Sequence, residues 1–126
     1  MRPQLLMFDE TPEWDDLAVR VVVEVDGEQV EGRATGNVTT EDRLQIIARA
    51  SLDAAEQIHG EKLGRIVGVT TGEVEGLAYV LVVLSAAGSA DHAVGAAPLR
   101  HFEDRAQVAI RAVFDAVNRR LFGVQM

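Results

Sequence analysis

Apolar and polar residues alternate along residues 17–25, where every second position is a leucine or a valine. This period of two is the pattern of a strand with one buried face. Asp26-Gly27 follows directly and predicts a tight hairpin, because both central residues of a type I′ turn need a positive φ angle. A second strand is therefore expected over residues 28–36. Its Gly32, Ala34 and Gly36 share one face, and either a helix or a second subunit must approach that face closely.

Two later segments repeat apolar residues every three to four positions, which predicts helices over residues 41–59 and 103–121. Thr39 or Thr40 is expected to cap the first helix, and Gly60 to end it. Residues 77–84 form an unbroken apolar run, as expected for a central strand that is covered on both faces. Weaker strand patterns flank this run, so three strands are expected between the helices, over residues 62–70, 77–84 and 92–99.

The predicted order is β-β-α-β-β-β-α, which is that of an α+β protein. We expect a two-layer sandwich in which a mainly antiparallel five-stranded sheet carries both helices on one face. Residues 1–16 are acidic and are expected to form an N-terminal arm whose Trp14 covers the edge of the domain. The alternative is that this arm is an acidic, aromatic peptide for a partner. Residues 17–126 then make up a single domain.

The two predicted helices are near-copies of each other at an offset of 62 residues. Identical residues occupy 8 of the 19 positions from 41 to 59, where about one or two are expected from composition. In the first copy they are Glu41, Asp42, Arg43, Gln45, Arg49, Ala50, Asp53 and Ala54. The sequence therefore predicts a pseudo-twofold internal duplication with repeat units of about 17–60 and 61–123. Each unit would hold two strands and a helix, with one extra strand between the units.

The core-facing positions of the two helices differ in size. Ile47 corresponds to Ala109, and Ala48 corresponds to Ile110, so a large residue in one copy matches a small one in the other. Two helices that lie side by side would share a fixed core volume in this way. The divergence of the core is thus expected to reflect packing between the helices.

The polar positions of the helices match instead of diverging. Arg49 and Asp53, like Arg111 and Asp115, are predicted to form i, i+4 ion pairs on the solvated face. The alternative is that the matched positions face a symmetric partner or a ligand. The residues of that interface would be Arg49, Asp53, Arg111, Asp115, Asn118 and Arg119.

Composition narrows the classes of function. A net charge of −8 argues against proteins that follow nucleic-acid phosphates or bind anionic membranes. No stretch approaches the roughly 20 apolar residues that a membrane span needs. The absence of cysteine excludes disulfides and thiolate chemistry. We therefore expect a cytoplasmic protein with no nucleic-acid or membrane partner.

Candidate chemistry is sparse. His59, His92 and His101 lie far apart in the sequence and in no metal-binding motif, so neither a metal nor a cofactor is expected. An enzyme with acid–base chemistry would have to use His92 or His101 with a carboxylate. Asp91-His92 lies close to Ser85 and Ser89, although no nucleophile-elbow motif surrounds these serines.

The end of the last predicted helix, from Ala112 to Arg119, carries an Ala-x-x-x-Ala-x-Asn-Arg pattern. This pattern resembles the end of the regulatory domain of 2-isopropylmalate synthases. The resemblance covers about 20 residues, and the duplicated plan is similar more loosely. It implies a domain that dimerises and binds an amino-acid effector near its pseudo-symmetric interface, with Asn118 and Arg119 as interface or helix-terminus residues. The chain departs from the family in having Glu103-Asp104-Arg105 before the helix and in lacking the catalytic barrel.

These observations favour a non-enzymatic binding or regulatory module that forms a homo-oligomer. It would act through a small ligand or a protein partner. A small enzyme using a histidine and a carboxylate, and a structural or assembly protein, are the alternatives.

Overall fold

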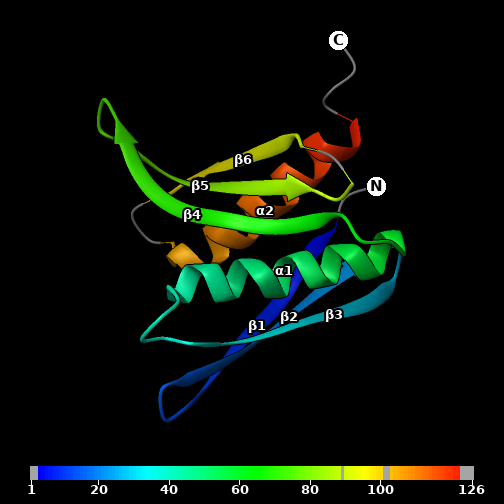
Figure 1. Cartoon of the computed structure of the whole chain (residues 1–126), viewed down its shortest axis with the longest axis horizontal. Helices are drawn as coiled ribbons and strands as arrows, with labels where there is room; N and C mark the ends of the chain where they lie inside the picture. The colour runs from blue at the N-terminus through cyan, green and yellow to red at the C-terminus, as the bar shows by residue number, and fades with distance from the viewer. Residues whose placement is uncertain (1–2, 89, 101–102, 123–126) are drawn as a thin grey trace.

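The computed structural model describes residues 3–88, 90–100 and 103–122, with the backbone alone for residues 120–122. The chain forms two successive units, each with three strands followed by a helix (Figure 1). The first unit consists of β1 (Gln4–Glu13), β2 (Asp16–Val25), β3 (Glu28–Asn37) and α1 (Arg43–His59). The second consists of β4 (Gly64–Val74), β5 (Leu77–Ala86), β6 (His92–Pro98) and α2 (Arg105–Phe122).

The strands form two separate antiparallel sheets, ordered β1-β2-β3 and β4-β5-β6, which we call the N-terminal and the C-terminal sheet. The prediction of a single five-stranded sheet is therefore wrong, whereas the α+β class is compatible with the structure. The reason lies in the path of the chain after β3. Helix α1 packs along the inner face of β2 and β3, and β4 begins on the far side of that helix. Strand β4 thus starts a new sheet instead of extending the first.

The segment expected to be an acidic arm forms strand β1 and pairs with β2 along its whole length. The repeating unit therefore has three strands, and β4, which looked like an extra strand, is the counterpart of β1. A β-bulge marks the same place in both strands, between Leu5 and Met7 in β1 and between Ile66 and Gly68 in β4. Trp14 lies in the β1–β2 turn and is 98% exposed, so it does not cover the edge of the domain.

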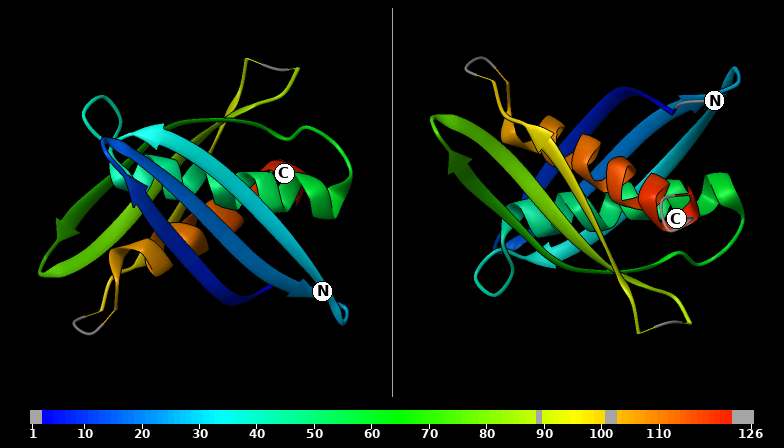
Figure 2. Two further views of the ribbon diagram at one scale, coloured as in Figure 1. Left: turned by 90° about the horizontal axis from the view of Figure 1, so that it is seen from below. Right: turned by 90° about the horizontal axis from the view of Figure 1, so that it is seen from above.

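Both helices lie between the two sheets, as the opposite views of Figure 2 show. One buried cluster fills the space against the C-terminal sheet, and a second fills the space against the N-terminal sheet. Each cluster contains residues of both helices. Alternate side chains of β2 and β5 point into these clusters, as the sequence predicts for Leu17, Val19, Val21 and Val23.

The large and small helix residues are distributed differently from the prediction. Ile47 and Ile110 both belong to the cluster against the N-terminal sheet. Ala48 and Ala109 both belong to the cluster against the C-terminal sheet. At these two pairs, the large residue of one helix therefore does not offset the small residue of the other. Ile47 and Ile110 thus face the N-terminal sheet, and Ala48 and Ala109 face the C-terminal sheet.

Close approach between helix and strand occurs at matched glycines. A Cβ atom on Gly32 would overlap the Ala50 carbonyl oxygen and come within 2.8 Å of the Ala54 Cβ. A Cβ atom on Gly95 would meet Ala112 and Ala116 in the same way, also 2.8 Å from the latter's Cβ. The element that approaches the small-residue face of residues 28–36 is thus a helix of the same chain.

Candidate functional site

The matched arginines of the two helices hold the loops that lead into those helices. The Arg49 guanidinium donates to the Glu41 carboxylate at 2.7 and 2.8 Å and to the Thr35 carbonyl oxygen at 2.7 Å. Arg111 pairs with Glu103, the counterpart of Glu41. Among the described residues, these pairs replace the i, i+4 pairs that the sequence predicted with Asp53 and Asp115.

The matched aspartates tie each helix to the strand beneath it. The Asp53 carboxylate accepts a hydrogen bond from the backbone N–H of Arg33 at 2.9 Å. The Asp115 carboxylate accepts one from the backbone N–H of Ala96 at 3.0 Å. Arg33 and Ala96 directly follow the two glycines on which the helices pack. The aspartates therefore fix the closest contact between helix and sheet.

The shared Glu-Asp sequence before each helix also has one role in both copies. The Asp42 carboxylate accepts from the Leu44 backbone N–H at 2.8 Å and caps α1, so the cap is neither Thr39 nor Thr40. The Asp104 carboxylate accepts from the Ala106 N–H at the same distance. The four shared positions of Glu41, Asp42, Arg49 and Asp53 thus serve the fold within one chain in both copies.

Six residues were predicted as an interface. Four of them make the contacts described above, and Asn118 and Arg119 lie outside these contacts. Arg119 is exposed and donates to Asp115 at 3.2 Å, and Asn118 is exposed beside it. The role of Arg49, Asp53, Arg111, Asp115, Asn118 and Arg119 in binding stays a prediction. Charge reversal at Arg49 or Arg111 would also break a pair that supports a helix start, so it would report on the fold as well.

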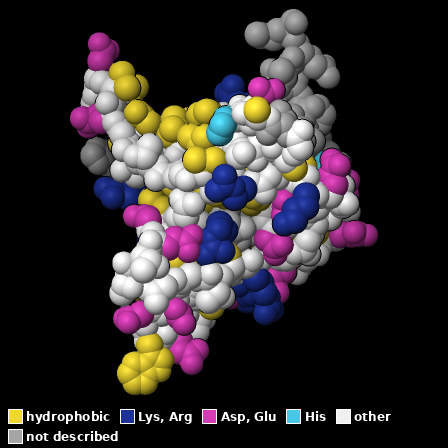
Figure 3. Space-filling model, in the orientation of Figure 1, with side chains coloured by type: hydrophobic (Ala, Val, Ile, Leu, Met, Phe, Trp, Pro, Cys, Tyr) yellow, Lys and Arg dark blue, Asp and Glu magenta, His cyan; other side chains and the backbone are white. Residues whose placement is uncertain are grey.

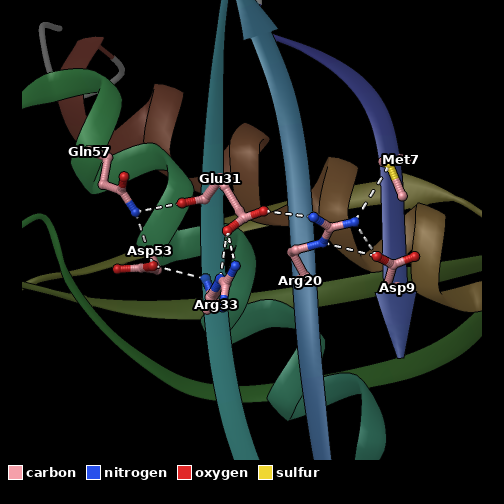
Figure 4. Close-up of polar contacts among 7 residues, drawn as sticks. All are labelled: Met7, Asp9, Arg20, Glu31, Arg33, Asp53 and Gln57. Carbon is pink, nitrogen blue, oxygen red and sulfur yellow. Dashed lines mark hydrogen bonds and ion pairs between the residues drawn. The ribbon is translucent and has the colours of Figure 1, made fainter. Parts of the chain in front are cut away.

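The outer faces of the two sheets are where the copies diverge most. On the N-terminal sheet, charged side chains form a ladder across the three strands (Figure 4). Arg20, on the central strand, donates to Asp9 on one side and to Glu31 on the other. Glu31 also accepts from Arg33 at 2.6 Å. Next to this ladder, above Ala18, lies a hollow of about 350 Å³. The ladder keeps this outer face polar and water-facing.

The ladder shifts the pKa values of its members. The pKa of Glu31 lies below its ordinary value of 4.5, chiefly because Arg33 donates a hydrogen bond to the carboxylate. Partial desolvation opposes this shift, and a hydrogen bond from Arg20 adds to it. The hydrogen bond with Asp9 is the largest cause of the raised pKa of Arg20.

This shift predicts an acid dependence of stability. A carboxylate whose pKa is lower in the folded state stabilises the fold above its unfolded pKa, and this contribution is lost as the pH falls through the folded pKa. Replacing Glu31 with glutamine should therefore lower the free energy of unfolding at neutral pH. The difference from the wild-type protein should shrink as the pH falls below about 4.5. Urea unfolding at several pH values measures it; a difference that does not change with pH would contradict the assignment.

The outer face of the C-terminal sheet carries uncharged residues, most of them apolar, at the positions of the ladder. The two sheets can be aligned through their matched hairpins and glycines. In this alignment Leu81 corresponds to Arg20, and Val94 corresponds to Glu31. Thr70 and Ala96 replace Asp9 and Arg33 in the same way. We call this surface the apolar face; its residues are Val67, Val74, Leu77, Tyr79, Leu81, Val83, Val94, Ala96 and Pro98.

The apolar face is open to solvent in the chain. Leu77 is 75% exposed and Val74 is 60% exposed, at the β4–β5 hairpin. Val67 and Val94 are 46% and 44% exposed towards the other end of the strands. A hollow of about 300 Å³ lies on this face beside Tyr79 and Pro98. Figure 3 shows hydrophobic side chains gathered on the concave upper surface of the molecule, over this sheet.

The sequence signal for this face is the apolar run of residues 77–84, whose pattern predicts a strand covered on both faces. Val80, Val82 and Leu84 are indeed fully buried against the helices. Tyr79, Leu81 and Val83 point to the other side, where no described element of the chain covers them. The run thus marks a strand whose second face lacks a cover within one copy.

Candidate catalytic groups are not gathered into a pocket. His92 is exposed at the start of β6 and lies opposite Ser85 in the strand register. His101 and Ser89 lie outside the described residues. Within the described ranges, no group of three or more histidine, aspartate and glutamate residues could hold a metal ion. In the same part of the chain, no helix is both long and apolar enough to cross a membrane.

The chain matches no protein-family profile, and no curated protein sequence matches it significantly.

Proposed function

We propose that the protein is a non-enzymatic binding module that self-associates through the apolar face of its C-terminal sheet. One observation carries this proposal: the duplication places an ion-paired ladder on one outer face and an uncharged apolar surface at the same positions of the other. The two sheets have the same strand order and the same close packing against a helix. This shared architecture therefore does not require apolar side chains on an outer face. An exposed apolar surface of this kind is typical of an interaction site.

A second copy is a suitable partner for this face on electrostatic grounds. Each copy carries a net charge of −8, so most contacts between two copies would bring like charges together. The apolar face has no charged side chain among its defining residues, and its burial would desolvate no charge there. The resemblance of the last helix to a dimerising regulatory domain points in the same direction.

The test is the oligomeric state of matched variants. Val94→Glu places a charge on the apolar face, and Val38→Glu places one at an equally exposed valine in the loop before α1; the two valines are 44% and 47% exposed. We expect Val94→Glu to weaken self-association at least tenfold, because a buried unpaired carboxylate costs more than about 1.4 kcal/mol. Sedimentation equilibrium over a range of concentrations measures the dissociation constant.

Val38→Glu should leave self-association unchanged, and circular dichroism should show that both variants fold. A wild-type protein that stays monomeric up to millimolar concentration would overturn the proposal. An equal effect of both variants would show that net charge, and not the apolar face, governs association.

A further inference from the structure

We infer that two copies dock face to face with antiparallel strands, so that the β4–β5 hairpin of each copy covers the far end of the partner's sheet. This inference rests on the proposed function and specifies its geometry.

The shape of the C-terminal sheet is asymmetric along its strands. The β4–β5 hairpin rises from the sheet and projects beyond the helices (Figure 1), and the apolar side chains gather on the concave surface beside it (Figure 3). Two such sheets with parallel strands would bring both raised hairpins to the same end, where they would collide. With antiparallel strands, each raised hairpin passes over the lower end of the other sheet.

The most exposed apolar residues fall into two groups at opposite ends of this sheet. Val74 and Leu77 flank the hairpin turn. Val67, at the β-bulge, and Val94, which pairs with Val83, lie towards the opposite end. Antiparallel docking places the first group of each copy against the second group of the other, so both groups are buried twice in a single symmetric interface.

Exposed charged side chains lie at both ends of this sheet, and Glu75 and Arg65 form one pair of opposite sign. Glu75 lies in the hairpin turn, where its φ angle is 49°. Arg65 is exposed at the other end and lies opposite Ser85, which places it on the outer face of the sheet. Antiparallel docking brings Glu75 of one copy towards Arg65 of the other, whereas parallel docking brings like charges together. These exposed charges select the orientation more than they add affinity.

The absence of cysteine makes the orientation directly testable, because each introduced thiol is the only one in its chain. One protein carries Leu77→Cys and a second carries Val94→Cys; each is treated with a short bismaleimide alone and in an equimolar mixture. We expect a crosslinked dimer mainly in the mixture. Val74→Cys with Val67→Cys tests the same arrangement at neighbouring positions, so a small shift in register does not hide the result. Asp16→Cys with Gln29→Cys, on the outer N-terminal sheet, is the control and should give no crosslink.

Each other outcome overturns a defined part of the inference. Crosslinking of Leu77→Cys or Val74→Cys alone would show parallel docking and overturn the orientation, while leaving self-association in place. A dimer in sedimentation that none of the apolar-face pairs crosslinks would show that another surface makes the contact. A protein that sediments as a monomer at every concentration would overturn the proposed function itself and leave a different protein as the occupant of the face.

Discussion

Replacing Gly95 with alanine is expected to lower the free energy of unfolding by about 2–3 kcal/mol, near the upper end of the usual cost of overpacking. The added methyl group would overlap the Ala112 carbonyl oxygen and crowd Ala116. These atoms belong to the helix backbone and to a side chain with no rotamers, so neither can move aside cheaply. The helix would have to shift from the strand, and the hydrogen bond from Ala96 N–H to Asp115 would lengthen.

The duplication provides a second test and a control for this prediction. Gly32→Ala should cost about the same, because its contacts with Ala50 and Ala54 are those of Gly95 with its own helix. Gly68→Ala is the control: this residue is also in a strand, but a Cβ atom there would meet nothing within 4 Å. It should change stability by less than about 1 kcal/mol. Urea unfolding measures all three. A loss at Gly68 as large as at the other two would show that β-strand glycines matter for a reason other than close approach.

The sequence predicts the elements with strong local signals. Asp26 and Gly27 both have positive φ angles in the β2–β3 turn, which confirms the hairpin. Helix α1 ends at Gly60, whose φ angle of 72° is that of a left-handed cap. In both places neighbouring residues that tolerate a positive φ angle carry the required backbone conformation, so no information from distant parts of the chain is needed.

Strand β1 shows what local signals miss. Its residues are apolar from Leu5 to Phe8 and then acidic, without a regular alternation. It pairs with β2 as an edge strand, and much of its surface remains exposed. Such a strand is stabilised by its neighbour and not by its own pattern. Once β1 is missed, the three-strand repeat and the division into two sheets cannot be inferred from the order of elements.

The sequence points to a site at the positions where the two copies agree, whereas the open apolar surface lies at positions where they differ. Shared polar residues such as Asp42, Arg49 and Asp53 cap, pair and anchor within the chain. Their tertiary partners include the Thr35 carbonyl and the Arg33 N–H, and backbone groups of this kind leave no trace in sequence periodicity. The contrast between Arg20 and Leu81 becomes visible only when the strands are aligned through their hairpins.

Ile47→Ala is expected to lower the free energy of unfolding by about 3 kcal/mol, because the side chain is fully buried in the cluster against the N-terminal sheet. Adding Ala109→Ile to this variant distinguishes the two accounts of the core. If the helices shared one volume, as the sequence suggested, the new isoleucine would restore stability.

In the structure, Ala109 instead belongs to the other cluster, against the C-terminal sheet, where it is fully buried. An isoleucine there would overpack that cluster and leave the cavity at position 47 unfilled. We therefore expect the double variant to lose about 5 kcal/mol, with the two losses roughly additive. Urea unfolding of the two single variants and the double variant completes the cycle. Recovery of stability in the double variant would show that positions 47 and 109 share one core volume instead of lying in two separate clusters.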